Sequence, residues 1–284
     1  MTKRVWAVNI LLIVFFAGGC TKFDLLNATV PACGYDRIAD IAYGDNPRQR
    51  LDVYRSTQVK SNGRVVIFFY GGYWREGDRA NYRFVGQALA AKGFIAVVPD
   101  YRLYPETTFP GFVQDGALAV RWVVDHIAQF DGDPKQLYLL GHSAGAHTAA
   151  LLTLNAEYLR AVGLDQSIVR GAAGLSGPYD FVPKGEDRAV FSMQPGDISN
   201  PAMHPANFVD NHAAPMLLLH GREDDFVLPE NSTNLATAIT KAGGKARSIL
   251  YPGLGHATVV LAIARSFQWL APVLDDCATF FMEN

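Results

Sequence analysis

Residues 137–150 read LYLLGHSAGAHTAA and are the most informative segment of the 284-residue chain. Its first four residues form an apolar run that is typical of a buried strand, and the small residues that follow 145 are typical of a packed helix. The pentapeptide between them, 141–145, places a serine between two glycines. A tight turn from a strand into a helix strains its central residue, and glycines two positions away leave room for that turn. The pattern therefore predicts that Ser143 lies at a helix N-terminus, where backbone N–H groups stabilise negative charge.

The chain on both sides of this turn alternates between strand-like and helix-like segments. Apolar runs predict strands at 50–54, 64–70, 94–98, 136–140, 169–175, 215–220 and 245–251. Helices are predicted at 80–92, 112–130, from the serine turn to about 154, at 231–242 and at 258–281. Such alternation predicts an α/β fold with a mostly parallel central sheet that is covered by helices on both faces.

Two stretches carry more specific expectations. Residues 50–54 alternate between apolar and polar side chains, which is typical of a half-buried strand. Residues 176–211 depart from the strand–helix alternation because they contain several prolines and scattered aromatics. We expect this second stretch to be a small cap-like insertion over the C-terminal edge of the sheet, within a single domain that spans 38–284.

The overall composition excludes several classes of protein. Hydrophobic residues make up 49% of the chain and charged residues 18%, which excludes intrinsic disorder. The 25 Lys and Arg residues against 27 Asp and Glu residues give a formal net charge of −2, so the composition offers no argument for nucleic-acid binding. The three cysteines, Cys20, Cys33 and Cys277, lack zinc-ligand spacing, and we expect no metal site.

The N-terminus has the pattern of a secretory signal. Two cations precede an apolar run at 5–16, which is short for a membrane span, and Ala-Gly-Gly-Cys follows at 17–20. These residues resemble the lipobox of bacterial lipoproteins, in which the cysteine is acylated and becomes the first residue. We therefore expect a signal peptide at 1–19, a lipid anchor on Cys20 and a tether at 20–37. The alternative is an ordinary cleaved signal with a cysteine present by chance.

This resemblance implies an extracytoplasmic protein that is attached to a membrane. Thr21 rather than aspartate follows the cysteine, which in a Gram-negative host implies the outer membrane, facing the periplasm. In such an oxidising compartment, Cys33 and Cys277 either form a disulfide or stay as two unpaired thiols, and the sequence leaves both open.

A nucleophilic serine needs a base, and the base needs an orienting carboxylate. In folds with this nucleophile turn, the acid and then the histidine follow the serine, on loops after later strands. Asp224 follows the strand predicted at 215–220, and His256 stands in a glycine-rich loop after the last predicted strand. Glu223 and Asp225 are alternative acids. The other six histidines fit less well by position; they are His126 in a helix, His142 and His147 beside the serine, His204 and His212 in the insertion, and His220 at a strand end.

An acyl-transfer site also needs N–H groups that stabilise negative charge on the carbonyl oxygen. Residues 70–74, Tyr-Gly-Gly-Tyr-Trp, follow an early strand, and their glycines let the backbone approach a ligand closely. We expect the N–H groups of Gly72, Tyr73 and Ala144 to form this oxyanion hole.

Taken together, these motifs resemble the α/β-hydrolase superfamily. The resemblance is closest to the esterase branch that includes hormone-sensitive-lipase-like carboxylesterases, kynurenine formamidases and related HGGxW enzymes. The matching features are GGYW at 71–74, DYRL at 100–103, Asp133-Pro134, GHSAGAH at 141–147, His220-Gly221 with Asp224 and Val227, and Gly255-His256. The chain departs from the family motif at Tyr70, where the family usually has histidine. The resemblance implies that Asp100, Tyr101 and Arg102 brace the oxyanion loop.

The function expected from these features is hydrolysis of a small carboxylic ester through an acyl-enzyme, without a metal or an organic cofactor. Ser143 is the expected nucleophile, His256 the base and Asp224 the orienting acid. An amide hydrolase of the same fold, either arylformamidase-like or a peptidase, is the alternative, followed by a non-catalytic binding module.

The environment of the site is less determined by the sequence. Trp74 and Tyr179 are candidates for the substrate pocket, together with Tyr73, Tyr104 and Phe181, although ordinary core packing explains each of them as well. We further expect Phe226 and Val227 to pack onto the core, which would leave Glu223 and Asp225 facing water.

Overall fold

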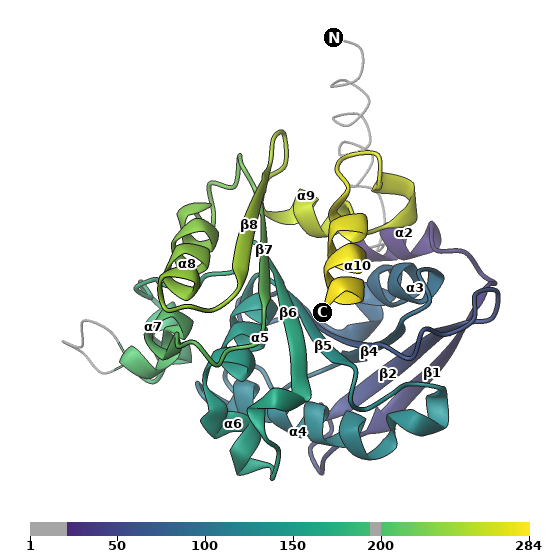
Figure 1. The fold of residues 1–284 in the computed structure, drawn as a ribbon, viewed down its shortest axis with the longest axis horizontal. Helices are drawn as coiled ribbons and strands as arrows, with labels where there is room; N and C mark the ends of the chain where they lie inside the picture. Colours follow the sequence, from purple (N-terminus) through teal and green to yellow (C-terminus); the bar gives the residue numbers. More distant parts are fainter. Residues whose placement is uncertain (1–21, 194–199) are drawn as a thin grey trace.

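The computed structural model describes residues 22–193 and 200–284. These residues form one eight-stranded sheet with the order β1-β2-β4-β3-β5-β6-β7-β8. Strands β1 and β2 are antiparallel, as are β2 and β4, and the other neighbouring pairs are parallel. The predicted mostly parallel sheet is therefore confirmed (Figure 1). The strands are β1 (Tyr35–Ala42), β2 (Arg50–Ser56), β3 (Val65–Phe69), β4 (Ile95–Pro99), β5 (Leu137–His142), β6 (Val169–Leu175), β7 (Met216–Gly221) and β8 (Ala246–Tyr251).

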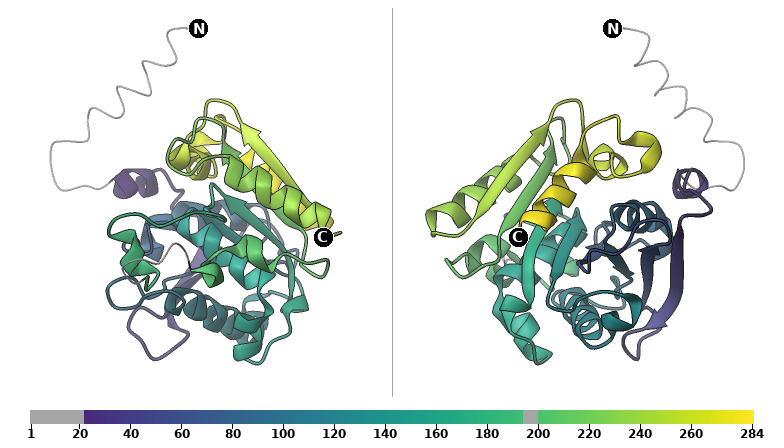
Figure 2. Two further views of the ribbon diagram at one scale, coloured as in Figure 1. Left: turned by 90° about the vertical axis from the view of Figure 1, so that its left-hand side faces the viewer. Right: turned by 45° about the vertical axis from the view of Figure 1, so that its right-hand side comes forward.

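Helices cover both faces of the sheet, as the alternation predicted (Figures 1 and 2). Helices α3 and α10 lie on one face, and α4, α5 and α8 lie on the other. The core strands β3, β4 and β5 are buried along their whole length, which is typical of parallel strands between two helical layers. The helices of these layers are α3 (Arg83–Ala91), α4 (Gly111–His126), α5 (Ala144–Leu154), α8 (Glu230–Lys241) and α10 (Val273–Glu283).

The prediction of one long helix near the C-terminus is wrong. The segment 258–281 contains three shorter elements instead of one helix: α9 (His256–Leu261), the 3-10 turn η7 (Arg265–Phe267) and α10. Pro272 is the N-cap of α10 and cannot continue a preceding helix, because it lacks the N–H group. Smaller differences occur at helix ends, where 3-10 turns form the start of the predicted 80–92 helix and the end of the predicted 112–130 helix.

Two elements near the N-terminus were not predicted. Helix α2 (Lys22–Ala28) and the start of β1 occupy part of the expected tether at 20–37. Strand β1 is an edge strand with mostly exposed or half-buried side chains, so it lacks the apolar run by which a strand is found in a sequence. The expected signal peptide and Cys20 lie outside the described residues. Cys33 is exposed and Cys277 is buried, and both are free thiols rather than a disulfide.

The segment between β6 and β7 lies within the stretch that was expected to be an insertion. Its described part contains α7 (Asp187–Val190) and the 3-10 turns η5 (Pro201–Met203) and η6 (Pro205–Phe208). Among the contacts that hold it against the rest of the domain, His147 Nε2 lies 2.6 Å from the Met203 carbonyl, Arg75 donates to the Glu186 carbonyl, and Phe109 N–H donates to the Val190 carbonyl. No helix in the described ranges is both long and apolar enough to cross a membrane.

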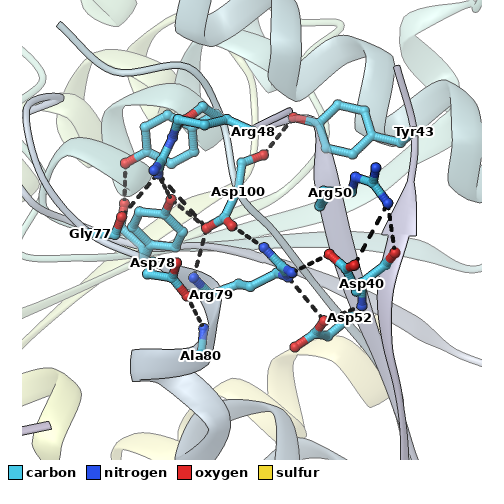
Figure 3. Close-up of polar contacts among 12 residues, drawn as sticks. Asp40, Tyr43, Arg48, Arg50, Asp52, Gly77, Asp78, Arg79, Ala80 and Asp100 are labelled. Atoms are coloured by element: carbon cyan, nitrogen blue, oxygen red, sulfur yellow. Dashed lines mark hydrogen bonds and ion pairs between the residues drawn. The ribbon is translucent and has the colours of Figure 1, made fainter. Parts of the chain in front are cut away.

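A cluster of charged side chains links the antiparallel strands to the parallel part of the sheet (Figure 3). We call Asp40, Asp52, Arg79 and Asp100 the Arg79 cluster. The Arg79 guanidinium contacts Asp40 at 2.7 Å, Asp52 at 3.0 Å and Asp100. Asp52 is fully buried, so the expectation that β2 is half-buried with this residue on a polar face is wrong. The carboxylate tolerates burial because Arg37, Arg79 and the Asp40 N–H all donate to it.

Arg79→Met should lower the free energy of unfolding by about 3 kcal/mol, because it leaves buried carboxylates with fewer compensating charges. The matched control is Arg121→Met, which removes an exposed ion pair with Asp125 one helical turn away and should change stability by less than about 0.5 kcal/mol. Urea denaturation of both variants measures the difference. Equal losses in the two variants would contradict a stabilising role for the Arg79 cluster.

Candidate active site

The turn at Ser143 has the strained geometry that its sequence predicts. Strand β5 ends at His142, α5 begins at Ala144, and Ser143 between them has φ 53° and ψ −121°. A Cβ atom on Gly145 would lie 2.0 Å from the Phe69 carbonyl oxygen, and one on Gly141 would lie 2.3 Å from the Gly145 carbonyl oxygen. Both positions therefore require glycine. At Gly145 the reason is that α5 starts in direct contact with the backbone at the end of β3, and at Gly141 it is that the turn folds back onto its own backbone at Gly145.

Ser143, His256 and Asp224 are connected by hydrogen bonds. His256 Nε2 lies 2.9 Å from Ser143 Oγ, and His256 Nδ1 lies 2.9 Å from Asp224 Oδ2. Each residue comes just after the C-terminal end of a strand, namely β5, β7 and β8. The Asp224 carboxylate is fully buried, whereas the imidazole of His256 is 20% exposed. The arrangement leaves the serine and histidine within reach of a substrate and keeps the carboxylate away from water.

Four donors surround the Asp224 carboxylate. Oδ1 accepts the N–H groups of Phe226 and Val227, and Oδ2 lies near His256 and, at 3.1 Å, near Nε2 of His220. Burial acts to raise the pKa of Asp224, but the hydrogen bonds from His220, His256 and Val227 outweigh it and hold the pKa well below its ordinary value. The acid is therefore ionised at neutral pH.

His220 is a positioning residue that sequence reasoning missed, since it was expected only to cap its strand. Its Nε2 also lies 2.8 Å from the Val227 carbonyl, and its Nδ1 lies 2.8 Å from Ser232 Oγ in α8. A neutral imidazole with the proton on Nε2 satisfies all three contacts, with the Ser232 hydroxyl donating to Nδ1. The ring thus ties the acid loop to α8, and only its position at the end of the predicted strand 215–220 hinted at such a role.

The two histidines beside the nucleophile do not contact the Ser143 hydroxyl. His142 Nε2 lies 3.0 Å from the backbone carbonyl of His256, so it holds the loop that carries the base. His147 contacts the Met203 carbonyl from inside α5. Burial lowers the pKa of His142 to about 3 and that of His147 to about 4, so both rings are neutral.

The neighbours of Asp224 face solvent. Glu223 and Asp225 are exposed, and Glu223 accepts a hydrogen bond from the Gly253 N–H at 2.6 Å. Val227 is buried as expected, but the expected inward packing of Phe226 is wrong, because this side chain is 50% exposed. The tight loop around the carboxylate turns Phe226 outward. Its ring packs on those of His256 and Tyr73, with distances between ring centroids of 4.9 Å and 5.0 Å respectively.

The loop after β3 lies next to the nucleophile. A Cβ atom on Gly71 would lie 2.9 Å from Ser143 Cβ, so the two segments touch. The next three residues have positive φ angles, which are 135° at Gly72, 56° at Tyr73 and 58° at Trp74. Ala144, the third expected oxyanion donor, is the first residue of α5. The three expected donors, Gly72, Tyr73 and Ala144, therefore come from two segments in direct contact.

The braces expected for this loop are present only in part. The hydroxyl of Tyr101 donates to the Tyr70 carbonyl at 2.7 Å, and Asp100 accepts from the Tyr70 hydroxyl at 2.7 Å. The expectation for Arg102 is wrong, because its guanidinium instead forms an ion pair at 2.7 Å with the buried Asp115.

The two candidates for the substrate pocket are core residues. Trp74 is 6% exposed and packs against Phe112, His147 and Phe191. Tyr179 is 1% exposed, with its hydroxyl against Gly174 of β6. Core packing, which was the alternative to a place in the substrate pocket, therefore describes both residues better. In the described part of the chain, no cluster of three or more His, Cys, Asp or Glu side chains is arranged to hold a metal ion.

Asp224→Asn should lower kcat/KM by about 10³- to 10⁴-fold. All four groups around the carboxylate are hydrogen-bond donors, and the side-chain NH₂ group of asparagine, itself a donor, would face one of them. Asp225→Asn, the matched control on the neighbouring exposed side chain, should stay within about tenfold. The measurement is hydrolysis of one short-chain ester, with circular dichroism to verify folding. A crippled Asp225→Asn enzyme would show that the wrong acid has been assigned.

Comparison with known proteins places this geometry in a family. The BD-FAE family model matches residues 51–239, which include Ser143 and Asp224 and end before His256. The chain is 31% identical over 274 residues to a probable isoprenylcysteine alpha-carbonyl methylesterase of Arabidopsis thaliana, covering 87% of this chain and 57% of that protein. It is 30% identical over 264 residues to the esterase LipC of Mycobacterium tuberculosis, covering 84% and 65% respectively. The chain thus spans less than two thirds of the length of these relatives.

Solved structures show the same fold. A truncated carbohydrate esterase from gut microbiota superimposes with a TM-score of 0.76 at 23% identity, over 89% of this chain and 98% of that chain. An esterase of Thermogutta terrifontis superimposes with a TM-score of 0.70 at 23% identity, over 88% and 92%. The family match covers more than half of the sequence, from β2 into α8, and the chain belongs to the BD-FAE family, with the α/β-hydrolase fold.

Proposed function

We propose that the protein is a carboxylic-ester hydrolase that acts through Ser143, His256 and Asp224. The observation that carries the proposal is the continuous chain of hydrogen bonds from Ser143 Oγ through the imidazole to the buried carboxylate. The relatives that the chain matches are named as esterases and a methylesterase, which supports an ester rather than an amide substrate. A small-molecule ester is therefore the substrate class that we propose.

The first half of the reaction forms an acyl-enzyme. Ser143 Oγ bonds to the acyl carbon while His256 Nε2 takes the hydroxyl proton, and the carbonyl electron pair moves onto oxygen. Asp224 keeps the Nδ1–H tautomer in place and stabilises the imidazolium that forms. The bond to the alcohol oxygen then breaks, and His256 Nε2 returns the proton to that oxygen as the alcohol leaves.

The second half releases the acid. A water molecule gives its proton to His256 Nε2 and bonds to the acyl carbon, and the Ser143 ester bond then breaks with the proton returned to Oγ. In both halves negative charge develops on the carbonyl oxygen. We propose that the N–H groups of Gly72, Tyr73 and Ala144 bind this oxygen, because they belong to the two segments that meet at the nucleophile.

We propose that the rings of Phe226 and Tyr73 form one wall of the site, on the side where the alcohol leaves. Phe226 packs on His256 and Tyr73 packs on Phe226, and both side chains are about half exposed. The alcohol must receive its proton from His256 Nε2, so it leaves next to this wall. The Phe226 ring, which packs directly on the imidazole, also shields it from bulk water on that side.

We further propose that the protein is a lipoprotein whose lipid anchor on Cys20 holds it at an extracytoplasmic membrane surface. The support is the sequence Ala-Gly-Gly-Cys at 17–20 after the apolar run at 5–16. In a Gram-negative host, Thr21 after the cysteine supports the periplasmic face of the outer membrane.

Ser143→Ala should lower ester hydrolysis by several orders of magnitude without loss of folding, because the members of such a triad act as a unit. It should also abolish labelling by a fluorophosphonate. Ser176→Ala is the matched control, since Ser176 is a second buried serine with a positive φ, of 48°, at a strand end, and it should keep activity within a few fold. Turnover near the wild-type rate in pure Ser143→Ala enzyme would refute the proposal. A formamide tested in parallel reveals an amide preference.

Cys20→Ser should abolish incorporation of a fatty-acid analogue in the native host and release the protein from the membrane fraction. Cys33→Ser, which removes the exposed cysteine that follows in the chain, should leave both unchanged. Mass spectrometry of the mature N-terminus checks the result independently. An N-terminus elsewhere without a lipid would disprove the anchor.

A further inference from the structure

Tyr70, the residue that replaces the histidine of the related motif, is the first residue of the oxyanion loop 70–77. It is fully buried, and burial holds the pKa of its hydroxyl well above the ordinary value, so the group keeps its proton. The hydroxyl donates to Asp100 Oδ1 at 2.7 Å and accepts from Arg48 Nη2 at 2.9 Å. A histidine side chain is too short to reach the same two partners from this backbone position.

The same guanidinium nitrogen also reaches the other end of the loop. Arg48 Nη2 donates to the Gly77 carbonyl at 2.9 Å, and Nε donates to the Tyr101 carbonyl at 2.9 Å. Figure 3 shows Arg48 placed between Gly77 and Asp100. A Cβ atom on Gly77 would lie 2.5 Å from the Tyr70 ring, so the two ends of the loop are in contact. Arg48 and the Tyr70 hydroxyl, together the Arg48–Tyr70 clamp, thus close the loop at its base.

The loop between these ends is strained, so its shape depends on how its ends are held. Tyr73 and Trp74 are non-glycine residues in the left-handed region, which costs roughly 1–2 kcal/mol for each residue. The chain folds back on itself, because the N–H groups of Arg75 and Glu76 both donate to the Gly72 carbonyl at 2.9 Å. A loop that stores strain relaxes toward ordinary φ values when a constraint on its ends is removed.

The clamp is itself anchored to the sheet. Asp100, which follows β4, accepts from the Arg79 N–H at 2.7 Å and pairs with the Arg79 guanidinium. Arg79 in turn contacts Asp52 in the middle of β2. The Tyr70 hydroxyl therefore connects the start of the strained loop to Asp100 of the Arg79 cluster and, through this cluster, to the strands.

We propose that the Arg48–Tyr70 clamp is a positioning device that sets where the oxyanion-binding N–H groups of the loop lie. The proposal rests on the proposed esterase function and goes beyond it, because it assigns a role in the transition state to a side chain that touches no substrate. The part of Tyr70 that acts is its hydroxyl, since the ring packs against Tyr82 and Tyr101 in any case.

Loss of the Arg48–Tyr70 clamp should slow only the step in which the oxyanion forms. Donors to an oxyanion act at 2.7–3.1 Å, and loss of a whole donor costs about 10²- to 10³-fold in kcat. Displacing donors by a few tenths of an ångström should cost less, about tenfold in kcat. The ground-state ester depends little on these hydrogen bonds, so KM should stay within about twofold.

The test compares Tyr70→Phe with Tyr54→Phe. Tyr54 is also fully buried, and its hydroxyl lies 3.4 Å from Asp52 at the opposite end of the Arg79 cluster, away from the loop. Tyr70→Phe should lower kcat about tenfold at nearly constant KM. It should also weaken, by a similar factor, inhibition by a trifluoromethyl ketone, whose adduct with the serine carries an oxyanion. Tyr54→Phe should keep all three constants within about twofold.

The outcomes separate this inference from the proposed function. Wild-type kcat and inhibitor affinity in Tyr70→Phe, or equal losses in both tyrosine variants, would overturn the clamp while leaving the esterase assignment intact. Absence of ester hydrolysis in the wild type, or full activity in Ser143→Ala, would overturn the function itself. If Tyr70→Phe does not fold, Arg48→Lys replaces it, because lysine keeps the charge but cannot bond Tyr70, Gly77 and Tyr101 together. Arg48→Lys must then show the same result, with kcat lowered about tenfold, KM nearly constant and weaker inhibition by the trifluoromethyl ketone.

Discussion

The contact between the start of α5 and the end of β3 is the constraint on which the site depends. Gly145 lies so close to the Phe69 and Tyr70 carbonyls that no other residue fits there. Because β3 leads directly into the loop that carries two of the proposed oxyanion donors and α5 begins directly after Ser143, this one backbone contact brings both halves of the proposed acyl-transfer site together. The residues with positive φ angles, Ser143 in the turn and Tyr73 and Trp74 in the loop, lie on the two segments that this contact brings together.

Two buried carboxylates then fix the loops that surround the nucleophile. Asp224 gathers four donors and so orients His256, while His220 ties the same loop to α8. Asp100 joins the oxyanion loop to Arg79 and to the antiparallel end of the sheet. In each case a charge that would be costly to bury is stabilised by groups from several elements. The loops therefore take their positions from the strands rather than from their own short sequences.

Local and periodic patterns in the chain were enough to predict the strands, the serine turn and the order of the site residues. Buried parallel strands such as β3, β5 and β7 are continuous apolar runs, whereas β2 shows an apolar–polar alternation, and all seven predicted strands lie close to the observed positions. The turn at 141–145 combines glycine spacing with a strand and a helix, and the order of serine, acid and histidine follows from strand ends along the chain. The prediction of a single helix at 258–281 was wrong because the amphipathic segments on both sides of Pro272 look like one continuous helix in the sequence.

Contacts between side chains that are far apart in the chain could be found only in the three-dimensional structure. Asp52 is buried because arginines from elsewhere neutralise it, and Phe226 is exposed because its own N–H turns back to Asp224. The partners of Tyr70 stand 22 residues before it and 30 residues after it. Whether such distant groups come within hydrogen-bond distance depends on sheet order and helix packing, which no local pattern encodes, and for this reason the support of the site could not be read from the chain.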